Sequence, residues 1–308
     1  MGTYNQSYQK EQAGLSRLKE KMKILVTGAR GQLGTDLVMR LQEDGYEVVP
    51  TDVEEMDITD MAQVREWIGR EKPDAVMHCA AWTNVDGAEA NEEACRRINV
   101  TGTENIARVC GEEDIKMLYL STDYVFRGTG IDFYHVDDEA DPVSVYGKTK
   151  YEGELAVMKY VKKYFIVRIS WVFGLYCKNF IKTMIGLGKK GISPSVVYDQ
   201  VGSPTYTYDL SILLSKMIAT ENYGVYHATN EGVCSWFELA EAVFRECGMD
   251  DIKVTPVSTE EYGAAASRPL NSRLDKSSLT NAGFDLLPSW EDALRRFIEA
   301  LGEEEAQN

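Results

Sequence analysis

The sequence predicts an α/β protein in which a doubly wound parallel sheet is joined to a smaller C-terminal α/β domain. Short apolar, β-branched segments alternate with helical segments through the N-terminal half of the chain. Such alternation is typical of a parallel sheet with helices on both faces. A glycine-rich turn joins the first predicted strand to the first predicted helix. The 308 residues can hold one domain of about 150–200 residues and a smaller partner.

The predicted elements of the sheet follow one another in a regular order. Strands are expected at residues 23–27, 46–51, 74–80, 116–121 and 164–170, and the later helices at 92–110 and 146–160. After about residue 175 this alternation gives way to stretches that contain Gly, Ser and Pro. We therefore place the core at residues 22–175 and mainly the smaller domain at 176–308, with segments of the latter that can return to the core. Ser235 and Ser289 are expected to cap helices in the smaller domain.

The composition excludes several classes of function. A net charge of −16 argues against a general binder of nucleic acid or of anionic membranes, which would carry a basic surplus. No segment approaches the roughly 20 apolar residues of a membrane span. Residues 1–21 are polar, lack the apolar region of a signal peptide, and are expected to be an extension outside the fold. We therefore expect a cytoplasmic protein without a nucleic-acid or membrane partner.

Cysteine and histidine are not arranged as metal ligands in this sequence. The six cysteines are scattered without a CxxC pair, and the three histidines lie far apart. We therefore expect reduced, mostly buried thiols, structural roles for His78 and His227, and no metal site.

The first predicted strand leads directly into Gly28-Ala29-Arg30-Gly31-Gln32-Leu33-Gly34. Glycines in such a turn permit close approach of the backbone to a pyrophosphate, which would lie at the N-terminus of the next helix. The first gap is one residue longer than in GxGxxG, and an ordinary glycine-rich turn is the alternative. The strand before the turn and the helix after it favour dinucleotide binding.

Asp52 and Arg30 bear on which dinucleotide is bound. Asp52 ends the second predicted strand, about twenty residues after the glycines, where an acidic side chain suits the ribose 2′-hydroxyl of NADH. A role in capping the turn is the alternative for Asp52. Arg30 lies within the glycine turn, where its guanidinium could reach the 2′-phosphate of NADPH. We therefore expect NADH to be favoured and leave the use of NADPH open.

Tyr146 and Lys150 form a YxxxK pair at the start of a predicted helix. Residues at i and i+4 face the same way on a helix. A lysine ammonium beside a phenol favours the phenolate, so the tyrosine can donate and accept a proton near neutral pH. The pair alone also fits a solvated helix face, and its interpretation depends on the rest of the chain. Thr122, directly after the fourth predicted strand, is a candidate to hydrogen-bond the reacting oxygen.

The glycine turn, the segment 121–126 (STDYVF) and the YxxxK pair, in this order, resemble the extended short-chain dehydrogenase/reductase superfamily. Three later stretches are similar to dTDP-4-dehydrorhamnose reductases: 168–174 (RISWVFG), 199–205 (DQVGSPT) and 268–274 (RPLNSRL). The resemblance runs from about residue 22 to residue 301. It implies a Rossmann-type core, a C-terminal substrate-binding domain, and NAD(P)H-dependent reduction of the 4-keto group of a nucleotide-linked deoxysugar, dTDP-4-dehydrorhamnose to dTDP-rhamnose.

The resemblance also assigns roles to individual residues. Tyr146 would donate a proton to the ketone oxygen, Thr122 would hydrogen-bond the same oxygen or the tyrosine, and Lys150 would hold the nicotinamide ribose. The implied cofactor-binding residues are Gly28, Arg30, Gly31, Gln32, Leu33, Gly34, Asp52, Asp57, Ile58, Ala80, Ala81, Thr83, Asn99, Tyr146 and Lys150. The implied substrate-binding residues are Asp123, Tyr124, Val125, Trp171, Asn179, Arg268 and Arg273. Related reductases can form homodimers with a divalent ion such as Mg²⁺ at the interface, although no acidic cluster here assigns such a site.

The same residues also distinguish among other activities of the superfamily. Dehydratases place an Asp-Glu pair after the threonine, whereas Tyr124 follows Asp123 here, which argues against dehydration. The alternatives are an epimerase and a non-catalytic nucleotide-binding subunit that resembles the regulatory subunit of methionine adenosyltransferase. The intact set of Thr122, Tyr146 and Lys150 favours an enzyme.

Several residues that are implied to contact the substrate can instead have ordinary structural roles. Asp123 can cap a turn, and Trp171 at a strand end can belong to the core. An acidic protein that binds a diphosphate must concentrate cations locally, so Arg268, Arg273 and Lys178 are candidates for that contact. Each of the three can also be an ordinary surface charge.

Overall fold

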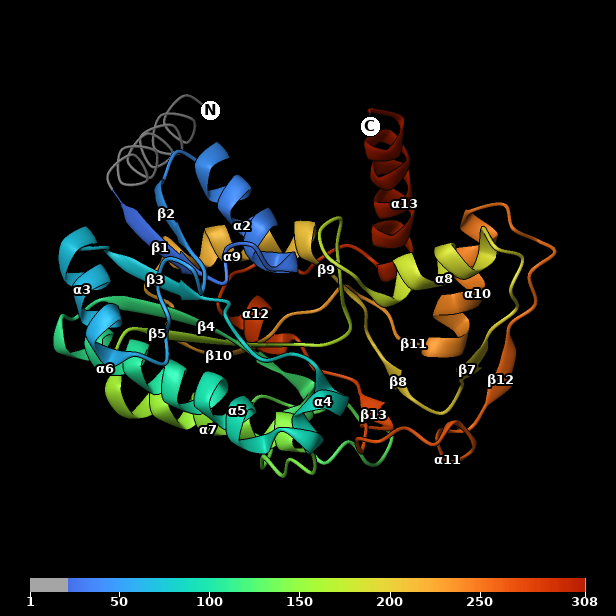
Figure 1. Cartoon of the computed structure of the whole chain (residues 1–308), viewed down its shortest axis with the longest axis horizontal. Helices are drawn as coiled ribbons and strands as arrows, with labels where there is room; N and C mark the ends of the chain where they lie inside the picture. The colour runs from blue at the N-terminus through green and yellow to red at the C-terminus, as the bar shows by residue number, and fades with distance from the viewer. Residues whose placement is uncertain (1–21, 308) are drawn as a thin grey trace, which may run out of the picture.

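Six parallel strands form the central sheet of the computed structural model, which describes residues 22–307 (Figure 1). The strand order is β10-β5-β4-β3-β1-β2. The strands are β1 (Lys23–Thr27), β2 (Glu47–Thr51), β3 (Ala75–His78), β4 (Lys116–Thr122), β5 (Tyr164–Ile169) and β10 (Gly224–His227). The chain runs from β1 outward to β2 and then returns to β3 on the other side of β1. This reversal lies between β1 and β3, and ligands of such sheets bind beyond the carboxyl ends of the strands at the reversal.

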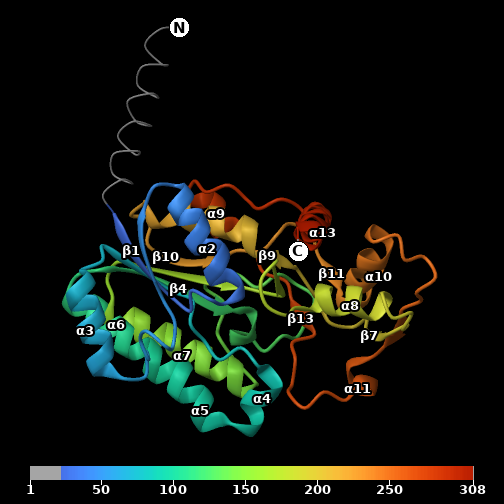
Figure 2. The same ribbon diagram turned by 45° about the horizontal axis from the view of Figure 1, so that its top comes forward.

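Helices cover both faces of the sheet because alternate strand residues point to opposite faces (Figure 2). Ile24 and Val26 pack with the helices of one face, and Leu25 packs with those of the other. The first face carries α2 (Gln32–Glu43), α9 (Thr207–Ile218) and α12 (Ser277–Asn281), and the second carries α3 (Met61–Glu71), α6 (Thr103–Glu112) and α7 (Val145–Tyr160). The fold class predicted from the sequence is confirmed.

A smaller lobe lies beyond the carboxyl ends of the strands and has its own apolar core (Figure 1). Its helices are α8 (Phe180–Gly188), α10 (Trp236–Glu246), α11 (Thr259–Tyr262) and α13 (Trp290–Gln307). Its short strands are β6 (Val172–Phe173), β7 (Ser195–Val197), β8 (Val201–Gly202), β9 (Thr205–Tyr206), β11 (Cys234–Ser235), β12 (Thr255–Val257) and β13 (Asn271–Ser272). The chain does not divide at one point, because α9 and β10 return to the central sheet.

Local sequence signals account for most element boundaries. Ser235 begins α10 with a complete capping box to Glu238, and Ser289 accepts a hydrogen bond from the backbone of Asp292 at 3.3 Å. The predicted helix at 92–110 is instead divided into α5 (Glu92–Arg96), the π-helical segment η1 (Arg97–Gly102) and α6. Single π-helical turns within helices often occur at functional sites.

The predicted structural histidines are buried, and burial lowers the pKa of both His78 and His227 to about 3. Both rings are therefore neutral at physiological pH. None of the helices within residues 22–307 has the length and apolar character needed to cross a membrane. The predicted extension at 1–21 lies outside the described residues.

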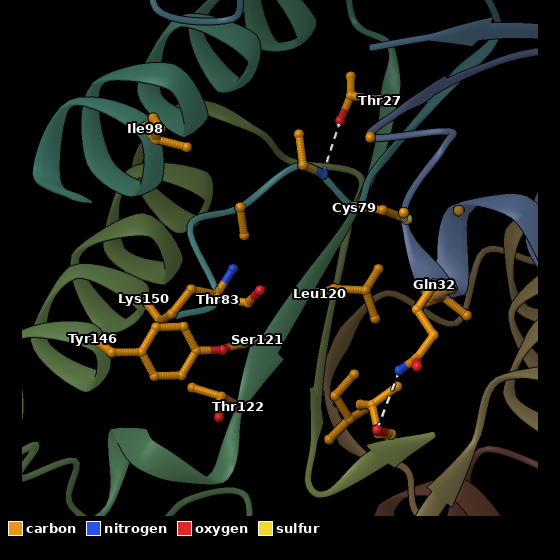
Figure 3. Close-up of a pocket in the computed structure, with 18 of the residues that line it drawn as sticks. Thr27, Gln32, Cys79, Thr83, Ile98, Leu120, Ser121, Thr122, Tyr146 and Lys150 are labelled. Carbon is orange, nitrogen blue, oxygen red and sulfur yellow. Dashed lines mark hydrogen bonds between the residues drawn. The ribbon is translucent and has the colours of Figure 1, made fainter. Parts of the chain in front are cut away.

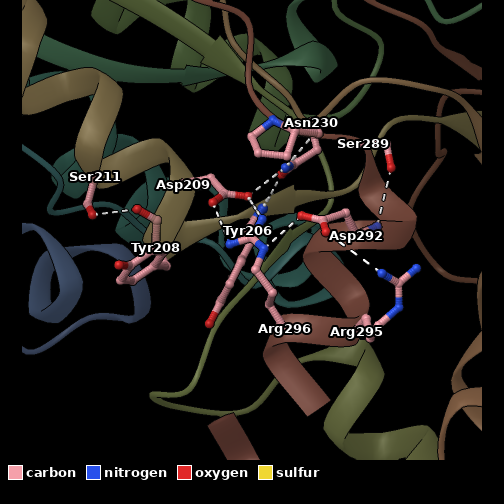
Figure 4. Close-up of polar contacts among 10 residues, drawn as sticks. Tyr206, Tyr208, Asp209, Ser211, Asn230, Ser289, Asp292, Arg295 and Arg296 are labelled. Atoms are coloured by element: carbon pink, nitrogen blue, oxygen red, sulfur yellow. Dashed lines mark hydrogen bonds and ion pairs between the residues drawn. The ribbon is translucent and has the colours of Figure 1, made fainter. Parts of the chain in front are cut away.

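A buried carboxylate connects the last helix to the helix that covers the sheet (Figure 4). Asp209 on α9 is 6% exposed and accepts hydrogen bonds from Arg296 on α13 at 2.8 and 2.7 Å. Asn230 donates to the same carboxylate at 2.8 Å, and Arg296 also donates to Asp292 at 2.7 Å. This network joins the smaller lobe to the central sheet through charge-assisted hydrogen bonds.

Arg296→Met should lower the free energy of unfolding by about 2–3 kcal/mol, because it leaves the Asp209 carboxylate buried without its cation. The loss stays below that of a wholly buried pair because the Arg296 side chain is 32% exposed. Urea unfolding followed by circular dichroism measures the change. Arg295→Met is the matched control: its side chain is 56% exposed, and the change should stay within about 0.5 kcal/mol. Equal stability of the two variants would contradict the role assigned to Asp209.

Candidate active site

A cavity of about 760 Å³ lies at the carboxyl ends of the central strands, between the sheet and the smaller lobe (Figure 3). Its lining includes most of the residues that the sequence singled out. From the predicted cofactor set the cavity is lined by Gly28, Gly31, Gln32, Leu33, Gly34, Asp52, Asp57, Ile58, Ala80, Ala81, Thr83, Tyr146 and Lys150. From the remaining predicted residues it is lined by Thr122, Asp123, Tyr124, Trp171, Lys178 and Asn179.

The glycine turn brings the backbone of β1, β3 and α2 into close contact. Gly28 has a φ of 65°, and a Cβ atom there would lie 2.7 Å from the backbone nitrogen of Ala80. A Cβ atom on Gly34 would lie 2.0 Å from the carbonyl oxygen of Gly28. Gly31 begins α2 without a side-chain cap. Backbone N–H groups at the start of α2 are thus free to bind an anion such as a pyrophosphate.

Asp52 and Arg30 lie at one end of this cavity. The Asp52 carboxylate accepts hydrogen bonds from the backbone nitrogens of Arg30 at 3.0 Å and of Val53 at 2.8 Å. The Arg30 side chain points to Glu54 and Glu55, forms ion pairs with both, and does not line the cavity. Of the two side chains, Asp52 is therefore the one presented to a ligand.

Tyr146, Lys150 and Thr122 lie close together in the lining of the cavity (Figure 3). Ser144 caps the N-terminus of α7 by accepting a hydrogen bond from Gly147 at 3.1 Å, which places Tyr146 in the first turn and Lys150 one turn later. Thr122 is the last residue of β4. The three side chains thus come from a helix and a strand that pack against each other, rather than from mobile loops.

Burial sets the protonation of the reactive groups. It lowers the pKa of Lys150 to about 7, and the carboxylate of Glu154 opposes this shift. Burial raises the pKa of Tyr146, and its hydrogen bond with Thr122 opposes that shift. The sequence suggested that Lys150 would lower the pKa of Tyr146, but the net shift of Tyr146 has the opposite direction because desolvation of the phenolate is the larger effect.

A buried ion pair supports the helix that carries Tyr146 and Lys150. Glu154, one turn after Lys150, accepts hydrogen bonds from Arg168 on β5 at 2.9 and 2.7 Å. Ser121 on β4 donates to the same carboxylate at 2.5 Å. Glu154 is fully buried and Arg168 is 4% exposed. The pair therefore joins α7 to two strands directly behind the reactive groups.

Asp123 connects the reactive threonine to the smaller lobe. Thr122 donates a hydrogen bond to Asp123 at 3.0 Å, and Ser272 on β13 donates to the other carboxylate oxygen at 2.5 Å. Burial raises the pKa of Asp123 to about 6, and both hydrogen bonds oppose the shift. Because the Asp123 carboxylate binds both lobes, it orients Thr122 as well as lining the cavity.

Five of the predicted site residues do not line the cavity: Arg30, Asn99, Val125, Arg268 and Arg273. Asn99 is buried in the π-helical segment, where its amide donates to Thr149 at 3.1 Å and accepts from the backbone of Trp82 at 2.8 Å. Asn99 therefore joins α7 to the loop after β3 without lining the cavity itself. Val125 is buried in a small apolar cluster.

The two predicted arginines are held by other protein groups. Arg268 pairs with Asp86 on α4 (Val85–Ala90), with one nitrogen–oxygen distance of 2.5 Å. Arg273 donates a hydrogen bond to the side chain of Asn271 at 2.9 Å. Within residues 22–307, no group of three or more His, Cys, Asp or Glu side chains is arranged to hold a metal ion.

Comparison with known proteins places this geometry in a family. A family model described as the RmlD substrate binding domain matches residues 22–303. The chain is similar to the structure of dTDP-4-dehydrorhamnose reductase from Bacillus anthracis in complex with NADP, at 44% identity and a TM-score of 0.88, covering 91% of this chain and 99% of that one. The chain belongs to the dTDP-4-dehydrorhamnose reductase family. The family predicted from the sequence is thereby confirmed.

Two further relatives of this reductase family match along nearly their whole length. The spore coat polysaccharide biosynthesis protein SpsK of Bacillus subtilis is 39% identical over 278 residues, which cover 90% of this chain and 97% of SpsK. The dTDP-4-dehydrorhamnose reductase of Aggregatibacter actinomycetemcomitans is 38% identical over 294 residues, covering 91% of this chain and 99% of its own. The similarity therefore includes both lobes and the cavity between them.

Some residues that line the cavity were not predicted from the sequence. Trp236 is the first residue of α10 and lines the cavity from the smaller lobe. Arg97 and Ile98, in the π-helical segment, also line it. Nothing local in the sequence signals these positions, because the capped start of α10 and the irregular helix at 97–102 reach the cavity only through tertiary packing.

Gly34→Ala should weaken binding of a nicotinamide dinucleotide by at least about tenfold and lower the melting temperature, because the added methyl group would displace the backbone of the glycine turn. Isothermal titration calorimetry and thermal unfolding measure the two effects. Gly69→Ala in α3 is the control, since a Cβ atom there meets nothing within 4 Å. That variant should gain about 0.5–1 kcal/mol of stability and bind the dinucleotide normally. Normal binding by Gly34→Ala would show that the turn does not hold the pyrophosphate.

Proposed function

We propose that this protein reduces the 4-keto group of a nucleotide-linked 6-deoxysugar with NAD(P)H, with dTDP-4-dehydrorhamnose as substrate and dTDP-rhamnose as product. The observation that carries the proposal is the convergence of Thr122, Tyr146 and Lys150 in a cavity that also contains the glycine turn. Membership of the reductase family supports the same activity.

The residues present fit a nicotinamide dinucleotide. The uncapped start of α2 suits a pyrophosphate, and the Asp52 carboxylate suits ribose hydroxyls. Lys150 reaches the centre of the cavity as a donor for the second ribose. When bound, the nicotinamide supplies the hydride that adds to the ketone carbon.

Side chains of the protein would neutralise and stabilise the negative charge that develops on the ketone oxygen. Tyr146 donates its proton to that oxygen, and the raised pKa of Tyr146 keeps the hydroxyl protonated until the transfer. Thr122 has a single hydroxyl proton, which it donates to Asp123 in this structure. With substrate bound, Thr122 would turn this proton to the ketone oxygen or to the Tyr146 oxygen and stabilise the developing negative charge. Lys150, when protonated, stabilises the resulting phenolate.

The alternative activities have less support in the cavity. A dehydratase needs a second acidic group beside Asp123, and the next residue is Tyr124, whose ring packs edge-on against Tyr146 with centroids 5.4 Å apart. A non-catalytic nucleotide-binding subunit does not require Thr122, Tyr146 and Lys150 to meet. An epimerase would leave the ratio of reduced to oxidised cofactor unchanged, so net oxidation of NADH or NADPH distinguishes it from a reductase.

Tyr146→Phe should lower kcat by about 10²–10⁴-fold while leaving dinucleotide binding largely intact, because it removes the proton donor and keeps the ring. Absorbance at 340 nm, a property of the reduced cofactor, measures turnover, and calorimetry measures binding. Lys150→Ala should weaken dinucleotide binding as well as turnover.

Tyr151→Phe is the matched control for the loss of a hydroxyl. Tyr151 lies on the same helix but packs in the small cluster that contains Phe126, away from the cavity. Near-normal reduction by Tyr146→Phe would remove Tyr146 from the mechanism.

We infer that NADH is favoured and that NADPH is also accepted. Asp52 faces the cavity and would repel a 2′-phosphate, whereas Arg30 is held by Glu54 and Glu55 at its edge. The relative from Bacillus anthracis is described in complex with NADP, so members of the family can bind the phosphorylated cofactor. In this chain Arg30 would have to leave its two carboxylates to contact the phosphate.

Asp52→Ala should shift the ratio of kcat/KM for NADH and NADPH toward NADPH, because it removes a carboxylate from the neighbourhood of the 2′ position. Steady-state kinetics with both cofactors provide the ratio. Asp52→Asn, which keeps the shape and removes the charge, should shift the ratio in the same direction. An unchanged ratio in both variants would mean that Asp52 does not discriminate between the ribose 2′-hydroxyl of NADH and the 2′-phosphate of NADPH.

We infer that the substrate diphosphate is bound by at least one of three cations: Lys178, Arg268 or Arg273. Lys178 is exposed, lines the cavity, and forms no ion pair within residues 22–307. Its neighbour Asn179 donates hydrogen bonds to Gln32 at 3.0 Å and to the backbone of Gly174 at 2.8 Å, which fixes this segment over the glycine turn. Arg268 would have to leave Asp86 to reach a phosphate.

Lys178→Met should lower kcat/KM for the nucleotide-linked keto sugar by about 10- to 150-fold, the loss expected for one charge-assisted contact. Arg268→Met and Arg273→Met are measured in the same series. Lys190→Met, an exposed lysine after α8 that does not line the cavity, is the control. If the Lys178, Arg268 and Arg273 variants all match the wild type, none of these cations binds the diphosphate. Equal reduction of the free sugar would contradict a nucleotide-sugar substrate.

A further inference from the structure

Two tryptophans from distant parts of the sequence stack against each other in the cavity wall. The ring centroids of Trp171 and Trp236 lie 3.9 Å apart with an angle of 15° between the planes. Trp171 follows β5, and Trp236 begins α10 in the smaller lobe. Both line the cavity.

Trp171 lies close to the reactive residues along the edge of the sheet. In the register of β4 and β5, Thr122 is paired with Ile169, and Trp171 follows two residues later. It therefore belongs to the part of the cavity beside Thr122. A ligand that presents its carbonyl to Tyr146 must pass close to this wall.

The backbone of Trp171 has an unusual conformation that needs support. Its φ is 50°, in the left-handed region that bulky residues rarely adopt. Its carbonyl accepts a hydrogen bond from Thr205 at 3.1 Å, and a Cβ atom on Gly202 would lie 3.1 Å from its indole ring. Such strained residues persist where the surroundings hold them, and they cluster at binding sites.

Trp236 is also held by contacts other than its stacking on Trp171. Phe180 packs against it with ring centroids 4.6 Å apart, and the capping box of Ser235 and Glu238 fixes the first turn of α10. Trp290, by contrast, is only 6% exposed in the core of the same lobe. Neither the Trp171 nor the Trp236 indole N–H has a hydrogen-bond acceptor within the described part of the chain, and neither is a buried unsatisfied donor.

We propose that Trp236 is a positioning residue for the sugar-nucleotide substrate: it holds Trp171 in its left-handed conformation, so that the two indoles form one aromatic wall beside Thr122. The wall offers apolar ring edges and two available N–H donors to a ligand with both apolar and hydroxyl-bearing parts, as a deoxysugar has. This inference rests on the proposed function for the identity of the ligand.

The test compares Trp236→Leu, Trp236→Phe and the control Trp290→Phe in the full-length protein. Trp236→Leu should raise KM for the keto sugar nucleotide by about tenfold through loss of the aromatic contact, with KM for the nicotinamide cofactor unchanged. Trp236→Phe retains a ring and should restore most of the lost affinity. Trp290→Phe should leave both KM values unchanged. A structural role alone would raise both KM values together, and that result would overturn the inference.

Two measurements separate this inference from the proposed reaction. Calorimetry with dTDP-glucose, which has no 4-keto group, measures substrate-site affinity without turnover. If the wild type binds dTDP-glucose but reduces no keto sugar, the proposed reaction fails, and the affinity of Trp236→Leu still decides the role of Trp236. Equal affinity of the wild type and Trp236→Leu would overturn the inference alone. The far-ultraviolet circular dichroism of the free protein should also lose the paired signal of coupled indoles in Trp236→Leu and in no Trp290 variant.

Discussion

The buried ion pair between Glu154 and Arg168 is the constraint on which the site depends. A charge pair removed from water is stable only when its hydrogen bonds are complete, and here Ser121 satisfies a remaining acceptor position of the carboxylate. The pair joins α7, which carries Lys150, to β4, which ends at Thr122, and to β5, which Trp171 follows two residues after its end. Those residues therefore keep fixed relative positions, and the same burial that makes the ion pair possible also shifts the pKa of Lys150.

Burial acts on the reactive groups in opposite directions, and the directions suit a reductase. A neutral phenol is ready to donate a proton, and a lysine with its pKa near 7 can change its charge within the physiological range. The supporting carboxylate of Glu154 opposes the lowering of the Lys150 pKa by burial. The surroundings of the pair, more than the YxxxK spacing itself, thus determine its chemistry.

The cavity is completed by contacts between the two lobes. Ser272 bonds to Asp123, Asn179 to Gln32, and Trp236 stacks on Trp171. Each contact links a residue of the smaller lobe to a residue beside the glycine turn or the reactive threonine. The two lobes are therefore also bound to each other around the space that a dinucleotide and a sugar nucleotide would share, which ties formation of the site to the correct docking of the smaller lobe.

The sequence alone determined the fold class and the glycine turn, and it predicted the roles of Asp52 and of the set Thr122, Tyr146 and Lys150. Each of these features is encoded by neighbouring residues with a fixed spacing along a strand or a helix. Only the tertiary structure decided that Trp236 and Ser272 join the site, that Asn99 supports it from behind, and that Arg268 is held by Asp86 while Lys178 faces the cavity. These assignments depend on segments far apart in the chain. Their contacts arise from how the lobes pack, for which no local pattern of residues exists.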